Sequence, residues 1–218
     1  MGNTELYIGQ RRMMVQRLQQ LQQKFPYDAQ VLEAMNIVPR HLFLEKGMEH
    51  LAYEDNPLPI AAGQTISQPS TVALQLTLSG IRRGGKILEI GTGCGYQSAV
   101  LVQMGARVYS VERQRELYLA ARRKLARTGY DNAIQFWGDG YKGLPQFAPF
   151  KAIVVACCAQ EIPRELLLQL EIGGKLVIPI EEKGIQVMAV IERISENEFN
   201  RTTHGRCSFV PMLEGINR

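Results

Sequence analysis

Residues 86–95 read KILEIGTGCG, a short apolar run followed by glycines at every second position. The run Lys86–Ile90 is typical of a buried strand, and the glycines predict a tight turn. Tyr96–Met104 then has the pattern of a helix. A strand, a glycine loop and a helix in this order predict the first unit of a parallel α/β sheet.

The sequence downstream repeats this alternation of apolar runs and helical patterns. Strands are predicted at Arg107–Val111, Ala133–Trp137, Lys151–Ala156 and Lys175–Ile180, and helices at Gln114–Arg127 and Glu161–Leu170, the latter ended by Gly173 and Gly174. Ile185–Arg193 and Cys207–Leu213 are predicted to close the sheet with antiparallel pairing. The alternation predicts an α/β fold with a doubly wound, mostly parallel sheet that has helices on both faces.

The sequence before this core has a different pattern and predicts an N-terminal helical extension. Leu6–Lys24 repeats apolar residues every three or four positions, as an amphipathic helix does, and Pro26 ends it. Asp28 is predicted to cap a second helix, and Leu42–His50 to form a third. We expect one domain, 1–218, made of a helical region (1–54), a loop with its helix (55–80), and the α/β core with closing strands (81–218).

Composition limits the possible classes of protein. The 218 residues are 45% apolar and 21% charged, which excludes disordered and collagen-like chains. The formal charge of +4 is modest beside that of a dedicated nucleic-acid binder. No apolar window approaches the length of a membrane span, and the first residues do not resemble a signal peptide. We expect a monomeric cytoplasmic protein that binds neither membrane nor nucleic acid.

The residues that follow the predicted strands suggest a ligand. In a doubly wound sheet, ligands bind beyond the carboxyl ends of the strands. The glycines of 91–95 let a ligand approach the backbone closely. Glu112, 21 residues after Gly91, has a carboxylate that can accept both hydroxyls of a ribose. Asp139, between two glycines, can receive an adenine amino group, so the set predicts an adenosine-shaped pocket.

The first loop is consistent with either of two adenosine cofactors, and also with a glycine turn that binds no ligand. Its glycines run G-x-G-x-G and not G-x-G-x-x-G, the pattern of dinucleotide binding. Glu89 lies two positions before Gly91 and suits a ligand that carries an ammonium group. S-adenosylmethionine has both the adenosine and the ammonium group, and Glu112 and Asp139 favour it over the alternatives.

The sequence also lacks the signals of several methyl acceptors and of metal sites. Residues 156–160 read ACCAQ, whereas nitrogen methyltransferases have Asn or Asp, two prolines and an aromatic residue after this strand. A Pro-Cys pair for pyrimidine carbon methylation is missing too. Cys157 and Cys158 are interpreted as small buried residues. The cysteines have no metal-ligand spacing, so we expect four thiols and no metal.

Residues 62–69, AGQTISQP, resemble the acceptor loop of the protein-L-isoaspartate (D-aspartate) O-methyltransferases. The likeness extends to VLEAM at 31–35, VPR at 38–40, LEIGTG at 88–93, VER at 111–113, GDG at 138–140 and FVP at 209–211, within residues 28–213. It implies the Rossmann-like fold of the class I adenosylmethionine-dependent methyltransferases. It also implies repair of damaged proteins and peptides by methylation of the free α-carboxylate of L-isoaspartyl residues, with S-adenosylhomocysteine as product.

The resemblance assigns residues to roles. Ser67 is at the family's active-site serine position, and Ile66 and Val210 would flank the substrate with Ser67. The residues expected to bind the cofactor are Gln64, Thr65, Glu89, Gly91, Thr92, Gly93, Gly95, Glu112, Arg113, Asp139 and Gly140. The sequence departs from the family where it has Ala159-Gln160 instead of Ala-Pro or Pro-Pro, and Cys94 instead of serine.

A carboxylate acceptor is already ionised at neutral pH and needs no general base. The isolated His41, His50 and His204 are therefore interpreted as packing or surface residues.

Other interpretations remain open from the sequence. Ser67 can be an ordinary helix N-cap before Pro69. Arg122, Arg123, Lys124 and Arg127 can be the phosphate-contacting patch of a nucleic-acid methyltransferase on the same fold, or only the solvated face of a helix. The chain can also be a non-catalytic adenosylmethionine-binding module whose first helix, with Arg11, Arg12 and Arg17, binds a partner.

Overall fold

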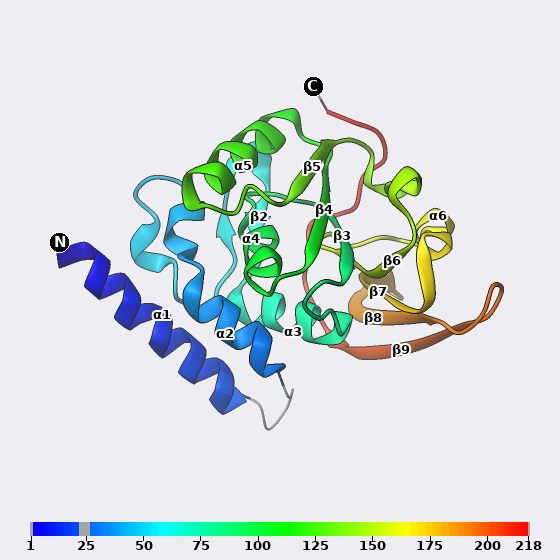
Figure 1. Cartoon of the computed structure of the whole chain (residues 1–218), viewed down its shortest axis with the longest axis horizontal. Coiled ribbons are helices and arrows are strands. Elements are labelled where there is room, and N and C mark those ends of the chain that lie inside the picture. The colour runs from blue at the N-terminus through cyan, green and yellow to red at the C-terminus, as the bar shows by residue number, and fades with distance from the viewer. Residues whose placement is uncertain (1, 22–26, 218) are drawn as a thin grey trace.

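The structure, a computed structural model, describes residues 2–21 and 27–217. Its centre is a sheet whose strands, within these residues, lie in the order β5-β4-β3-β6-β7-β8-β9 (Figure 1). The strands are β5 (Ile134–Trp137), β4 (Arg107–Glu112), β3 (Lys86–Ile90), β6 (Phe150–Val155), β7 (Leu170–Glu182), β8 (Ile185–Arg193) and β9 (Phe199–Arg206). The five strands from β5 to β7 are parallel, and β8 and β9 add antiparallel pairs at one edge. This confirms the predicted mostly parallel sheet.

The order of the strands creates a crevice next to β3. The chain runs outward from β3 to β4 and β5, then returns across the sheet to β6 on the other side of β3. The connections that leave the carboxyl ends of β3 and β6 therefore diverge in opposite directions. Such a switch point is where open α/β sheets bind ligands.

Two apolar layers cover the faces of the sheet. On one face, α3 (Pro69–Ser79), α4 (Tyr96–Gln103) and α5 (Arg115–Thr128) pack in a cluster that includes Ile87 of β3. On the other face, the short α6 (Arg164–Leu168) packs in a second cluster that includes Leu88. Successive strand residues point to opposite faces, so a fully buried strand is apolar throughout.

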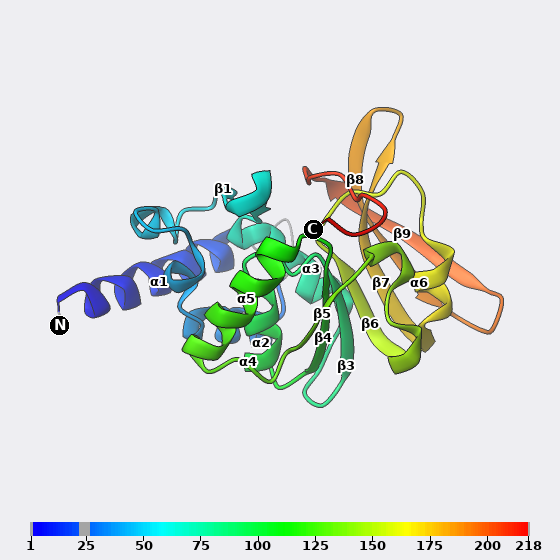
Figure 2. The same ribbon diagram turned by 90° about the horizontal axis from the view of Figure 1, so that it is seen from above.

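The N-terminal helices form an outer layer. α1 (Gly2–Gln20) packs against α2 (Ala29–Ile37), and both lie on the side of α3, α4 and α5 (Figures 1 and 2). Asp28 caps α2 as predicted, its Oδ1 accepting from Gln30 N at 2.8 Å. α1 begins earlier than the predicted Leu6. The expected end at Lys24 and Pro26 lies outside the described residues.

The predicted elements at the ends of the core need correction. The expected helix 42–50 is wrong: two 3₁₀ turns, Arg40–Phe43 and Glu49–Leu51, flank Gly47, whose φ of +94° interrupts a helix. The helix expected at 161–170 is confined to 164–168, because Pro163 is its N-cap residue and β7 already begins at Leu170. Gly173 and Gly174 thus lie within β7.

The predicted closing strand at 207–213 is also wrong. The last strand is β9, whose polar sequence suits an edge strand with exposed side chains. Residues 207–213 form only an isolated bridge, between Pro211 and Cys158. None of the described helices has the length and apolar character needed to cross a membrane.

Candidate active site

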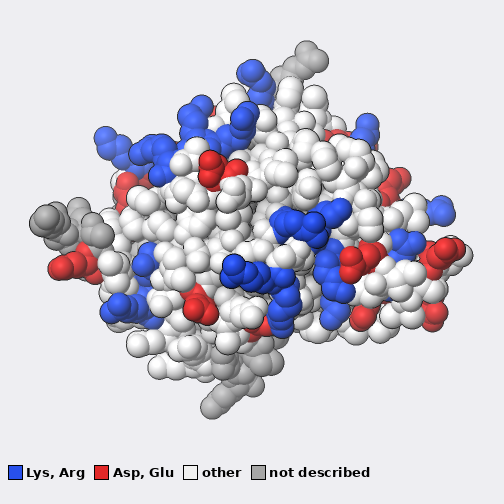
Figure 3. Space-filling view, in the orientation of Figure 1, with Lys and Arg blue, Asp and Glu red and all other residues white. Residues whose placement is uncertain are grey.

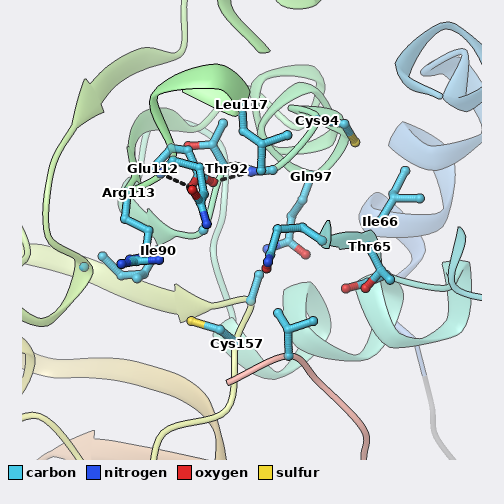
Figure 4. A pocket seen from close by; sticks show the side chains of 18 of the residues that line it. Thr65, Ile66, Ile90, Thr92, Cys94, Gln97, Glu112, Arg113, Leu117 and Cys157 are labelled. Atoms are coloured by element: carbon cyan, nitrogen blue, oxygen red, sulfur yellow. Dashed lines mark hydrogen bonds between the residues drawn. The ribbon is translucent and has the colours of Figure 1, made fainter. Parts of the chain in front are cut away.

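A cleft opens at the switch point, at the carboxyl ends of β3, β4 and β6 (Figure 4). Its empty volume, including the part open to solvent, is about 900 Å³. It is lined by segments that are distant in the sequence, at 64–67, 90–94, 96–97, 111–114, 156–157 and 210–213, with Val72, Leu117 and Gly140. The cleft thus brings together Gln64, Thr65, Ile66, Ser67, Gly91, Thr92, Gly93, Glu112, Arg113, Gly140 and Val210 of the predicted residues; Glu89, Gly95 and Asp139 are not among its lining residues.

A small hairpin carries the acceptor loop to the cleft. β1 (Leu58–Pro59) pairs with β2 (Thr65–Ile66), and Ile60 N donates to Gln64 O at 2.8 Å. This pairing holds residues 64–67 along one wall. In Figure 4, Thr65 and Ile66 lie on the side opposite Glu112 and Arg113.

Ser67 lies at the cleft and does not cap α3. The N-cap residue is Gln68, whose Nε2 donates to Ser70 Oγ at 2.8 Å. Within the described part of the chain, the Ser67 hydroxyl has no hydrogen bond to protein. The N-cap interpretation is therefore wrong, and the hydroxyl is available to a ligand.

Glu112 ends β4 with its carboxylate in the cleft and held from both sides. Its Oε2 accepts from Gly93 N at 2.9 Å and its Oε1 from Gln114 N at 2.8 Å (Figure 4). Burial raises the pKa of Glu112, and the backbone N–H groups of Gln114 and Gly93 oppose this shift. A carboxylate oxygen that accepts one N–H can still accept a hydroxyl. The arrangement fits the two hydroxyls of a ribose.

The glycine turn has two different functions. Gly91 and Gly93 line the cleft with φ of +92° and +54°, a conformation that other residues rarely adopt. Gly95 has a φ of +91°, and a Cβ there would lie 3.2 Å from the Leu125 side chain. Gly95 therefore permits close packing of the start of α4 against α5.

Gly140→Ala is expected to lower the melting temperature by about 5 °C, whereas Gly138→Ala should leave it within about 1 °C. A Cβ on Gly140 would lie 2.5 Å from Ile90 Cγ2 in the cleft wall, and one on Gly138 an ordinary 3.5 Å from Val111. Thermal unfolding followed by circular dichroism measures both. Equal melting temperatures for the two variants would contradict the tight contact.

Glu89 lies behind the cleft wall. Its Oε2 accepts from Ser98 Oγ and, at 2.6 Å, from Ser110 Oγ, and the residue is fully buried. The neighbouring strand residue Ile90 lines the cleft instead, because adjacent side chains alternate. A direct contact of Glu89 with a ligand's ammonium group stays a prediction.

Stability is expected to fall as the pH rises from about 4.5 to about 7, on account of Glu89. Burial, aided by the charge of Glu112 and opposed by the hydroxyls of Ser110 and Ser98, raises the pKa of Glu89 from 4.5 to about 7. In this pH interval Glu89 holds a proton in the folded state that it has lost in the unfolded chain. The free energy of unfolding therefore falls by an amount on the order of 3 kcal/mol across the interval. Urea unfolding at several pH values should show a shallower pH dependence for Glu89→Gln. Parallel curves for the variant and the wild type would contradict the assignment.

The C-terminal segment crosses the cleft. Cys158 N donates to Val210 O at 2.8 Å, and Met212 N donates to Cys158 O at 2.7 Å. Farther along, Asp139 Oδ2 accepts from Gly215 N at 3.0 Å, and its Oδ1 accepts from Tyr141 N. These two backbone N–H groups hold both oxygens of the Asp139 carboxylate. The contact of Asp139 with adenine stays a prediction.

Arg113 joins the same arrangement, because it lines the cleft and donates from Nε to Gly215 O at 3.2 Å.

Sequence reasoning missed several residues of the cleft. Tyr96 and Gln97 line it from the first turn of α4, a position that the strand, loop and helix pattern could have indicated. Leu117, Cys157 and Met212 carried no signal beyond being apolar or small. Burial raises the pKa of Cys157 to about 12, so it remains a neutral thiol at the cleft wall.

Cys94, Cys157, Cys158 and Cys207 are free thiols in the structure. Across residues 2–21 and 27–217, no group of three or more His, Cys, Asp and Glu side chains is arranged to hold a metal.

His41 is a packing residue, as interpreted: its ring stacks on Tyr7 at 4.0 Å, and its Nδ1 lies 2.7 Å from Tyr53 Oη.

Curated relatives match over the full length of the chain, and two of them illustrate the likeness. They are the protein-L-isoaspartate O-methyltransferases of Christiangramia forsetii, 46% identical, and Flavobacterium psychrophilum, 49% identical, each over 217 residues and 100% of both chains. Among solved structures, one protein-L-isoaspartate O-methyltransferase has a TM-score of 0.83 at 30% identity and covers 92% of this chain, which spans 65% of that chain.

A Plasmodium falciparum structure, of a β-aspartate methyltransferase in complex with S-adenosyl-L-homocysteine, has a TM-score of 0.81 at 24% identity, covering 93% of this chain and 98% of its own. This likeness concerns the fold.

The family model of the protein-L-isoaspartate(D-aspartate) O-methyltransferases matches residues 10–217. With this match and the full-length relatives, the chain belongs to the protein-L-isoaspartate(D-aspartate) O-methyltransferase family.

Proposed function

We propose that this protein transfers the methyl group of S-adenosylmethionine to the free α-carboxylate of L-isoaspartyl residues in damaged proteins and peptides. The observation that carries the proposal is that Ile66, Ser67 and Val210 line the same cleft as Glu112 and the glycine turn. Transfer needs donor and acceptor aligned in one enclosed site. Family membership and the full-length relatives support the same activity.

The residues of the cleft fit the cofactor. Each carboxylate oxygen of Glu112 has a lone pair left to accept from a ribose hydroxyl. Gly140 packs closely against Ile90, beside the expected position of the adenine. S-adenosylmethionine supplies, when bound, a methyl group on a positively charged sulfur. Gln64, Thr65 and Arg113 complete the proposed contacts along the walls.

The acceptor needs orientation rather than a base. Its carboxylate is ionised at neutral pH. The Ser67 hydroxyl donates to one carboxylate oxygen, and Ile66 and Val210 flank the substrate and exclude water from the nucleophile. In the methyl ester that forms, the neighbouring backbone amide nitrogen attacks the ester carbonyl, loses its proton and expels methanol, which gives a succinimide. Addition of water to the succinimide then restores part of the normal linkage.

The basic patch predicted on α5 is a weak candidate for nucleic acid. Figure 3 shows Lys and Arg side chains gathered over this helix, with acidic side chains among them. Lys124 Nζ donates to Phe43 O at 2.9 Å and pairs with Glu45 at 3.1 Å, while the Arg122 guanidinium lies over the Tyr118 ring. These contacts engage Lys124 and Arg122 within the fold, which weakens the patch as a phosphate-binding surface. We propose a monomeric cytoplasmic enzyme of one domain that binds no nucleic acid.

The first experiment offers methyl-labelled S-adenosylmethionine and two short peptides that differ only in L-isoaspartate or normal aspartate. Base-labile methyl ester on the isoaspartyl peptide alone is expected. Label on neither peptide, with cofactor binding confirmed by calorimetry, would overturn the proposal. A third peptide with D-aspartate tests the wider acceptor range that the family description includes.

A further inference from the structure

Arg40 is a fully buried cation that the proposed mechanism does not use. Its Nε donates to Ala52 O at 2.9 Å. Among the residues that the structure describes, neither Nη1 nor Nη2 has a hydrogen-bond partner, and no carboxylate lies within 4.0 Å of the guanidinium. A buried charge without a partner is costly, so its retention suggests a role in a charged ligand's site.

The guanidinium lies directly behind the cleft wall. Its Cζ is 4.9 Å from the centroid of the Tyr96 ring, and Tyr96 and Cys94 both line the cleft. The charge of Arg40 also acts on both of these side chains, lowering the pKa of each against the larger effect of burial. One layer of side chains therefore separates this cation from the space where a ligand binds.

The charges around the cleft have opposite signs on its two sides. Glu112 lines the side expected to hold the cofactor, and Glu89 lies behind it. In Figure 4, Cys94 lies on the same side as Ile66, which is proposed to flank the acceptor, and opposite Glu112. The cation behind Cys94 and Tyr96 thus backs the acceptor side of the cleft, while the acids belong to the side that receives a positively charged cofactor.

Charged groups of both signs act on the same wall as Arg40: Lys124 adds a positive charge that acts on Cys94, and Glu89 adds an opposing negative charge. Arg11 of α1 adds a positive charge that acts on Tyr96. The acid that acts on Arg40 is Asp55, which is exposed and uses Oδ1 to accept from Ser70 N at 2.8 Å. Solvent weakens the effect of such an exposed charge more than that of a buried one.

We propose that Arg40 is a specificity-determining residue, whose buried charge behind Tyr96 and Cys94 favours a carboxylate acceptor and disfavours a cation in the same cleft. The inference rests on the proposed function for the identity of the acceptor. At a separation of about 10 Å and an effective dielectric constant of about 20, one unit charge changes the affinity of an ion roughly tenfold. The effect acts on binding, because the carboxylate carries its charge before transfer.

The test compares ligands that differ by one charge. S-adenosylmethionine and S-adenosylhomocysteine differ by the methyl group and its positive charge, so the ratio of their Kd values reports the potential in the cleft. Arg40→Met should strengthen binding of S-adenosylmethionine relative to S-adenosylhomocysteine several-fold. It should also raise KM for the isoaspartyl peptide roughly tenfold with kcat nearly unchanged. Arg40→Lys should restore both values.

Asp55→Asn provides a second variant that keeps the acceptor for Ser70 N and removes the opposing charge. It should shift the ratio of Kd values in the opposite direction, by about twofold, and it remains informative if Arg40→Met does not fold. If folded Arg40→Met binds both ligands more weakly by the same factor, or if Asp55→Asn leaves the ratio unchanged, the proposal is overturned. Failure of the wild type to methylate the peptide would instead refute the proposed function, because the ratio of Kd values does not depend on turnover.

Discussion

Ser67→Ala is expected to lower methyl transfer to an isoaspartyl peptide by more than tenfold at saturating cofactor. Ser67 lines the cleft, and its hydroxyl has no hydrogen bond to the described protein residues, so its hydrogen-bonding capacity is free for the acceptor. Losing a hydrogen bond to a charged group costs about 1.5–3 kcal/mol, which corresponds to a tenfold or larger loss of rate if alignment depends on it. Initial rates with labelled cofactor measure the effect.

Stability separates this role from a structural one. The N-cap residue of α3 is Gln68, so removing the Ser67 hydroxyl should change the free energy of unfolding by less than about 1 kcal/mol. Ser70→Ala is the matched control, because Ser70 lies in the first turn of the same helix and outside the cleft lining. Transfer by folded Ser67→Ala at the rate of Ser70→Ala would refute the assignment.

Local patterns were sufficient to predict the fold at its centre. The apolar run before the glycines becomes β3, and the alternation that follows gives β4, β5 and β6 within one or two residues of their expected bounds. β3, β4 and β6 are mostly buried, so their apolar sequences report their structure directly, whereas β5 is a half-exposed edge strand that the alternation of strands and helices predicted. The edge strand β9 is polar and exposed. The apolar segment 207–213 that suggested a strand instead bonds to Gln186 of β8 and to Cys158, in the loop after β6, and lines the cleft.

The site was predicted best where backbone conformation or chain topology determines position. Glu112 is the last residue of β4 and reaches the cleft as the general rule for such sheets predicts. Glu89 is inside a strand, and the alternation of side chains places it behind the cleft wall, where it accepts a hydrogen bond from Ser98. Arg40 meets Ala52 and Tyr96 only through tertiary packing, so no local pattern could reveal its burial.

Glu112→Ala is expected to weaken binding of S-adenosylhomocysteine about a hundredfold. The variant loses two charge-assisted hydrogen bonds to the ribose, each worth about 1.5–3 kcal/mol, and it leaves the N–H groups of Gly93 and Gln114 without their acceptor. Glu112→Gln should also bind weakly, because its amide must turn an NH₂ group toward one of those two N–H donors. Calorimetric titration gives the Kd of each variant.

The control for Glu112 is Glu116→Gln, which removes the same charge four residues later, in the first turn of α5, at an exposed position outside the cleft lining. If Glu112 acts by contact with the ribose, Glu116→Gln should bind within about twofold of the wild type, since an exposed charge at this distance is screened. A comparable loss in both variants would mean that only the general negative potential matters. Unchanged affinity in Glu112→Ala would place the ribose elsewhere in the cleft.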